Sequence, residues 1–209
     1  MNQVFEYVHK ELEQGEKKLY KGIQLYFSPL RESEILFIGI NPGIGYSKYN
    51  NKNVKRLNPL EKFEYSGQKY LLATQTKKVF TELELGLQFS QAVKINQFPF
   101  ATTDEKSLKK LLDQYGKTHK LYYLSKKFVL QTIEDVKPKL IICEGKSSFD
   151  RLKNILQAEP VEYNENTYVL RHNNYVVIGY KRHLSFIKDK EELKEKIMMY
   201  YKKAAPNIV

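Results

Sequence analysis

The sequence predicts a three-layer α/β/α sandwich built around a central, mainly parallel sheet of four strands. Short apolar runs, typical of strands buried on both faces, alternate with longer segments of helical periodicity. The chain has 209 residues, of which 42% are hydrophobic and 13% aromatic. This length and composition suit one globular α/β domain with its own core. We therefore expect residues 1–209 to form a single domain.

The helices are predicted from apolar side chains that recur every three or four residues. The first of them covers residues 4–18. A long loop over residues 41–69 is rich in Asn, Gly, Pro and Lys, and loops of this length in a compact domain are often functional. The other helices are expected at residues 70–85, 104–115, 121–136, 145–156 and 188–202.

The four core strands are predicted from short apolar runs. They are expected at residues 34–40, 92–98, 139–143 and 175–180. Residues 161–171 alternate and turn at residues 164–166, which indicates a hairpin or an addition at the edge of the sheet. Ligands of parallel sheets bind beyond the carboxyl ends of the strands, so the segments that follow the strands are the candidate site.

Charge and cysteine content limit the function classes. The net charge of +11 favours polyanionic partners such as nucleic acid or acidic membrane surfaces, although a solvated, Lys-rich surface would explain it equally well. The single cysteine, Cys143, lies in an apolar run and excludes a disulfide or a multi-cysteine metal site within one chain. No signal sequence or apolar run of membrane-spanning length is present, so we predict a cytoplasmic monomer with no membrane contact.

The segment GINPG at residues 39–43 follows the first core strand. Its glycines let the backbone approach a ligand, but neither the dinucleotide-binding nor the P-loop spacing is present. By itself the segment also fits a tight turn capped by Asn41.

Two later strand ends carry polar side chains of a similar kind. Asn96 ends the second strand, and its amide offers the donor and acceptor needed to read a pyrimidine edge or to tie down the following loop. His183 and Ser185 follow the fourth strand, where they could support a developing anion and a phosphate. A solvated polar loop is the alternative reading there.

Taken together, these segments resemble the uracil-DNA glycosylase superfamily, in the right order from residue 34 to the final helix. GINPG looks like the first motif of the mismatch-specific and single-strand-selective branches, and INQFPF at residues 95–100 resembles the base-reading segment. LIICEGKSSFDRL at residues 140–152 is similar to the strand–Gly-Lys–helix segment of that superfamily. HLS at residues 183–185 looks like its His-Pro-Ser motif, with Leu184 in place of the proline.

The resemblance implies a monofunctional DNA glycosylase that removes uracil or a related damaged base from single- or double-stranded DNA, without metal or cofactor. Asn41 would orient the water, Asn96 would read the base, and His183 would donate to the uracil O2 region. The other expected substrate-binding residues are Gly39, Ile40, Pro42, Gly43, Tyr46, Phe63 and Tyr65, with Tyr46, Phe63 or Tyr65 stacking on the base. The expected DNA contacts are Lys146, Ser147, Arg182, Leu184, Ser185 and Phe186, with Leu184 or Phe186 filling the vacated stack.

Two other functions fit the same sequence. A catalytically silent nucleic-acid-binding protein on this fold would keep the net charge and the basic loop over residues 48–56. A small-molecule nucleotide enzyme that uses the same strand ends is the weaker alternative.

Overall fold

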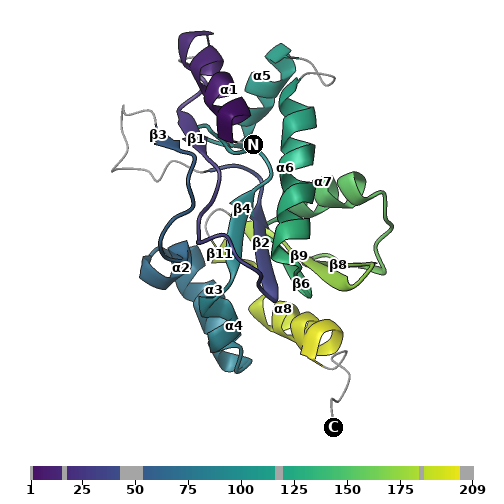
Figure 1. Ribbon diagram of the computed structural model, residues 1–209. Helices are drawn as coiled ribbons and strands as arrows, with labels where there is room; N and C mark the ends of the chain where they lie inside the picture. The colour runs from purple at the N-terminus through teal and green to yellow at the C-terminus, as the bar shows by residue number, and fades with distance from the viewer. Residues whose placement is uncertain (1, 16–17, 43–53, 116–119, 184–185, 203–209) are drawn as a thin grey trace.

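A six-stranded sheet lies at the centre of the protein (Figure 1), as seen in a computed structural model that describes residues 2–15, 18–42, 54–115, 120–183 and 186–202. Its strands, in spatial order, are β4 (Val93–Asn96), β2 (Ile35–Gly39), β6 (Leu140–Cys143), β9 (Tyr175–Tyr180), β8 (Thr167–His172) and β7 (Glu162–Tyr163). The first four strands are parallel to one another, β8 pairs antiparallel with β9, and β7 pairs antiparallel with β8. The α/β class and the mainly parallel order were therefore predicted correctly.

The prediction of four strands was wrong by two, because the edge hairpin is part of the sheet. β8 pairs with β9 along its whole length, from Thr167 opposite Tyr180 to His172 opposite Tyr175. β7 then pairs antiparallel with β8. The alternating pattern of this segment indicated a hairpin, but pattern alone does not say whether a hairpin joins the main sheet.

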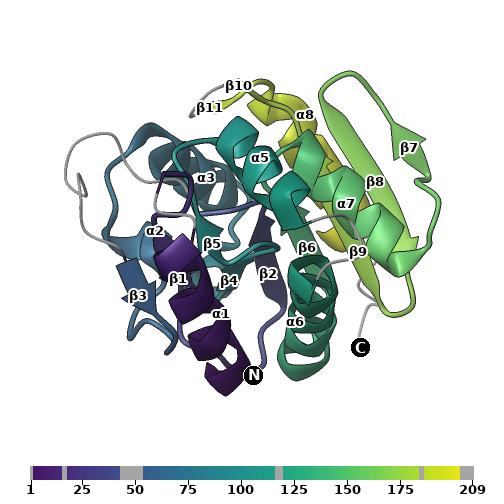
Figure 2. The ribbon, with the colours of Figure 1, turned by 90° about the horizontal axis from the view of Figure 1, so that it is seen from above.

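Helices cover both faces of the sheet (Figures 1 and 2). One layer contains α1 (Asn2–Gly15), α5 (Glu105–Tyr115), α6 (Lys120–Val136) and α7 (Lys146–Leu156). The other contains α2 (Glu64–Gly67), α3 (Leu71–Glu82), α4 (Gly86–Ser90) and α8 (Lys190–Ile197), and α8 continues as the π-helical turn η1 (Met198–Lys202). Successive side chains of a strand point to opposite faces, so β2 supplies Leu36 and Ile38 to the α6 side and Ile35 and Phe37 to the α3 side.

A small second sheet adjoins the β4 edge of the central one. It has the order β3-β1-β5, formed by β3 (Val54–Arg56), β1 (Gly22–Gln24) and β5 (Phe100–Ala101). Beyond β1 the chain continues beside β4, where the Phe27 N–H donates to the Lys94 carbonyl at 2.9 Å and Tyr26 bridges Ile95. The described part of the expected loop at residues 41–69 thus contains a strand, β3, and a helix, α2.

The segment after β9 also differs from the expected plain loop, because β10 (Arg182–His183) and β11 (Phe186–Ile187) pair as a short antiparallel hairpin. Among the described residues, no helix has the length and apolar character needed to cross a membrane.

Candidate functional site

Three polar or small residues share one face of the sheet at its carboxyl edge. Val93 and Ile95 of β4 point to the α6 side, so alternation directs Lys94 and Asn96 to the α3 side. Gly39 ends β2 on that same side, directly beside Asn96 in the register of the two strands. The expected convergence of the GINPG segment and the INQFPF segment is therefore present in the fold.

Gly39 makes room for the Asn96 side chain. A Cβ added at Gly39 would lie 2.1 Å from Asn96 Oδ1 and 3.3 Å from Glu144 Oε2. Asn96 is only 5% exposed, and within the described part of the chain its side-chain amide makes no hydrogen bond. The Asn96 amide atoms are not among the fully buried polar atoms that lack a partner, so they remain accessible to a ligand edge with a matching donor and acceptor.

The two segments are also tied together past the strand ends. The Gln97 N–H donates to the Gly39 carbonyl and the Phe98 N–H donates to the Ile40 carbonyl, both at 2.9 Å. These bonds extend the parallel pairing beyond β2 and β4, which fixes the place where Asn41 leaves the sheet.

Asn41 is half-buried, and its amide has a defined orientation. Its Nδ2 donates to Thr102 Oγ1 at 2.9 Å, and Thr102 Oγ1 donates in turn to the Asp104 carbonyl at 2.7 Å. Because the Thr102 hydroxyl proton is already used, that hydroxyl can only accept from Asn41. Asn41 Oδ1 makes no hydrogen bond within the described residues, and so the amide presents an acceptor.

His183 is an exposed residue of β10, in the short β10–β11 hairpin. Its ring packs edge-on against Phe186 with 5.2 Å between the centroids. The hairpin is held against α3, since the Ile187 N–H donates to Gln75 Oε1 at 2.9 Å. His183 is therefore on the Asn96 side of the sheet, but the described residues include no hydrogen bond between His183 and Asn41 or Asn96.

The predicted stacking residues Phe63 and Tyr65 are core side chains. Phe63 is 3% exposed and packs edge-on against Phe89 at 5.1 Å between ring centroids. Tyr65 is fully buried and one face of its ring lies 3.6 Å from Lys94 Nζ. In this structure the Tyr65 ring contacts Lys94 and is not exposed, and its role as a stacking residue stays a prediction.

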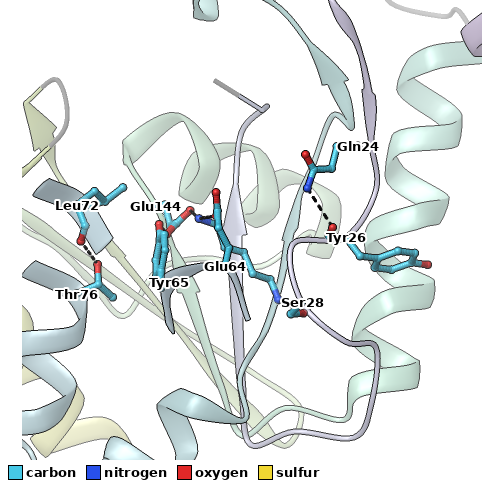
Figure 3. A network of polar contacts seen from close by, with 9 residues as sticks. Gln24, Tyr26, Ser28, Glu64, Tyr65, Leu72, Thr76 and Glu144 are labelled. Carbon is cyan, nitrogen blue, oxygen red and sulfur yellow. Dashed lines mark hydrogen bonds and ion pairs between the residues drawn. The ribbon is translucent and has the colours of Figure 1, made fainter. Parts of the chain in front are cut away.

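A buried ionic cluster lies behind the site and was missed by the sequence analysis (Figure 3). Lys94 Nζ is 2.9 Å from Glu64 Oε2 and 3.3 Å from Glu144 Oε2, and Tyr65 donates its hydroxyl to Glu144 Oε1. The contact to Glu64 is an ion pair without hydrogen-bond alignment, since Glu64 Oε2 has no hydrogen bond in the described part. Burial, and then the charge of Glu144, raises the pKa of Tyr65.

A signal for this cluster was present in the sequence. Lys94 interrupts an otherwise apolar strand, and Glu144 follows the fully buried run of β6 directly. Charges at such positions are paired when they are buried, so each indicates that a partner exists. The sequence does not show that Lys94 and Glu144 pair with each other, because this depends on the order of the strands in the sheet.

Basic side chains gather where β6 and β9 end next to each other. Lys146 and Ser147 are exposed at the start of α7, and Lys146 pairs with Asp150 at 2.5 Å, which raises the pKa of Lys146. The Arg182 side chain lies next to Gly145: a Cβ added at Gly145 would be 3.6 Å from Arg182 Cδ. The predicted DNA contacts from these two segments are therefore neighbours.

Four predicted residues, Gly43, Tyr46, Leu184 and Ser185, lie outside the described residues. Ile40 packs against the core on the α6 side, and Pro42 lines a cavity of about 780 Å³. The walls of this cavity come from β1, β3 and β5 and from residues 60–68.

In the part of the chain that the structure describes, no group of three or more His, Cys, Asp or Glu could hold a metal ion.

The chain was compared with protein-family models and with curated proteins. No protein-family model matches the chain, and no curated protein matches it closely enough to indicate a relationship.

Proposed function

We propose that this protein is a DNA glycosylase that hydrolyses the N-glycosidic bond of uracil or a related damaged base. The observation that carries the proposal is the pair of amides at the carboxyl ends of β2 and β4. Asn41 presents an oriented acceptor without a partner among the described residues, and the side chain of Asn96, 5% exposed, makes no hydrogen bond to a described residue. One amide that holds a water and one that reads a base edge are what this reaction requires.

In the proposed reaction, Asn41 Oδ1 accepts a hydrogen bond from a water molecule and turns a lone pair of that water toward the sugar carbon C1′. The water oxygen bonds to C1′ while the bond from C1′ to the base nitrogen breaks. The bonding electrons leave with the base, which is protonated later, and the water gives up a proton to solvent. Asn96 would bind the pyrimidine edge, and a base with a different edge would leave that buried amide unpaired.

His183 would act once DNA is bound, by donating to the oxygen on which negative charge grows. Lys146, Ser147 and Arg182 would contact the phosphates. The net charge of +11 supports DNA as the partner, because basic side chains supply most of the affinity for a phosphate backbone.

The test is excision of uracil from single- and double-stranded oligonucleotides that contain one uracil, detected by alkaline cleavage at the abasic site. We expect Asn41→Ala to lower the rate by roughly 100-fold or more, by loss of water orientation. Asn154→Ala, which removes an exposed amide from α7, is the matched control and should leave the rate unchanged. Equal inertness of the wild-type protein and Asn41→Ala over several damaged bases would refute the proposal.

A catalytically silent DNA-binding protein is the second candidate, favoured by the exposed position of His183 and its lack of a hydrogen bond to either amide within the described residues. Such a protein would bind oligonucleotides with an affinity that falls steeply with salt, and would leave uracil in place.

A further inference from the structure

We propose that the cavity beside α2 is a second nucleotide subsite, which holds the DNA nucleotide next to the one that Asn41 and Asn96 act on. The choice of a DNA strand as its source rests on the proposed function. The site itself is argued from three features of the cavity: two aromatic side chains in its wall, the amide acceptor of Gln24, and two cations in its lining. Neither Asn41 nor Asn96 lines this cavity, but Pro42, the residue after Asn41, does, so the cavity adjoins the proposed reaction site.

The floor of the cavity is aromatic. Phe27 and Phe63 both contribute to its wall and are 7% and 3% exposed. The two rings come from segments joined by a hydrogen bond, since the Glu64 N–H donates to the Phe27 carbonyl at 2.8 Å. A volume of about 780 Å³ is within the range of small-molecule sites and leaves room for a nucleotide.

The buried acceptor is the amide of Gln24. This residue is 8% exposed, and its Nε2 donates to the Tyr26 carbonyl at 3.3 Å. Gln24 Oε1 has no hydrogen bond in the described part of the chain. Figure 3 shows Gln24 and Glu64 from different elements, and both line the cavity. Each natural base carries at least one N–H on its edge, which would satisfy Gln24 Oε1.

Two cationic side chains, Arg56 and Lys62, belong to the lining of the cavity. Arg56 is the direct neighbour of Gln24 in the register of β1 and β3, so a cation stands beside the acceptor. Arg56 and Lys62 are both exposed and line the cavity, and neither forms an ion pair with a described residue. Glu61 and Glu64 add two carboxylates to the same lining, and Lys94 pairs with Glu64 as well as with Glu144. Unpaired cations at the mouth suit a phosphate, while the amide and rings suit a base.

The first experiment compares thymidine 5′-monophosphate with its N3-methyl counterpart, which lacks one N–H. We expect the wild-type protein to bind the unmethylated nucleotide about fivefold more tightly, in line with one hydrogen bond. Gln24→Met should abolish this preference. Arg56→Met should weaken both nucleotides and leave thymidine, which has no phosphate, unaffected.

Isothermal titration gives the affinities, and thermal melting shows whether each variant is folded. The comparison of the two nucleotides on wild-type protein needs no variant at all. Equal binding of the two nucleotides, or binding of neither, would overturn the proposal.

The second experiment identifies the source of the nucleotide. Oligonucleotides carry one uracil and an abasic analogue at the adjacent position on either side. If the strand supplies the nucleotide, one of these analogues weakens binding to wild-type protein by about fivefold, and the loss disappears in Gln24→Met. Free nucleotide binding with no effect of either analogue would contradict a strand source.

The two proposals fail separately. Nucleotide preference without uracil excision would remove the glycosylase proposal and leave the subsite intact. Uracil excision without any preference for the N–H would remove the subsite alone.

Discussion

Asn96 and Gln97 are consecutive amides at the end of β4, yet they have opposite surroundings. Gln97 turns to the α6 side, where its Nε2 donates to the carbonyl and hydroxyl oxygens of Ser148 at 2.5 and 3.1 Å. The Ser125 hydroxyl donates to the backbone carbonyl of Gln97. Asn96 turns to the α3 side, where its amide makes no hydrogen bond among the described residues. Both side chains are buried, so exposure does not distinguish them.

Only one of these two amides forms hydrogen bonds that stabilise the fold. Gln97 connects α6 and α7 to the strand end, and only its Oε1 lacks a partner in the described part. Asn96 contributes no such bond, and Gly39 is needed for it to fit. Asn41 is intermediate: its Nδ2 donates to Thr102 Oγ1, and its Oδ1 accepts no hydrogen bond from a described residue. A buried amide that the fold leaves unpaired is a candidate for function.

The largest expected effect is on catalysis at Asn96. Asn96→Ala should lower the uracil excision rate by about 100- to 1000-fold, the usual cost of one preorganised hydrogen-bonding group. Its melting temperature should remain near that of the wild type, because no bond within the described residues is lost. Rates under single-turnover conditions would measure this. A comparable loss of rate in Gln97→Ala would break the contrast between the two amides.

Gly39→Ala is expected to act through Asn96. The new methyl group would displace the Asn96 amide, and a misplacement of about 1 Å can cost roughly 100-fold in rate. The group that must move is the end of a side chain, so the fold should persist. The single-turnover rate and the circular dichroism spectrum of this variant give both quantities. Unchanged excision in a folded Gly39→Ala protein would show that the position of Asn96 is irrelevant.

Gln97→Leu should lower stability more than activity. It leaves the Ser148 carbonyl and hydroxyl without their donor, and such a loss costs about 1–3 kcal/mol in the free energy of unfolding. Urea denaturation with an unchanged m-value would measure it. If Gln97→Leu were as stable as the wild type while excision fell, Gln97 and not Asn96 would be the functional amide.

The smallest expected effect is at Thr102. Thr102→Val removes the hydroxyl that orients Asn41 and should lower the excision rate about fivefold, corresponding to one hydrogen bond. Thr102→Ser keeps the hydroxyl and should restore most of the rate. Failure of the serine variant to restore it would assign the effect to packing and not to orientation.

The sequence predicted the parts of the fold that depend on periodicity. The four parallel strands are close to the apolar runs that predicted them, and strand order then brought Asn41 and Asn96 to one edge. The short strands β1 and β3 have no strong pattern of their own, because their pairing partners lie far away in the sequence. The roles of the site residues stay predictions.

The parts that were missed depend on tertiary geometry. Thr102 reaches Asn41 across 61 positions, and Tyr65 reaches Glu144 across 79. Tyr65 was one of three candidates to stack on the base, and the sequence did not indicate that its ring contacts Lys94. No spacing rule in a single sequence encodes contacts of this range.

The strip of chain that runs beside β4 has a further consequence for solubility. An uncovered edge of a sheet can recruit a strand from another molecule. At the β4 edge, the backbone N–H groups of Gln24 and Phe27 donate to the carbonyls of Pro99 and Lys94 and so cover the edge. At the other edge of the sheet is the two-residue strand β7, whose Glu162 pairs with Lys196. A variant that detached residues 22–27 would therefore expose a template for intermolecular β-pairing, and the protein would be lost to aggregation before any change in chemistry could be seen.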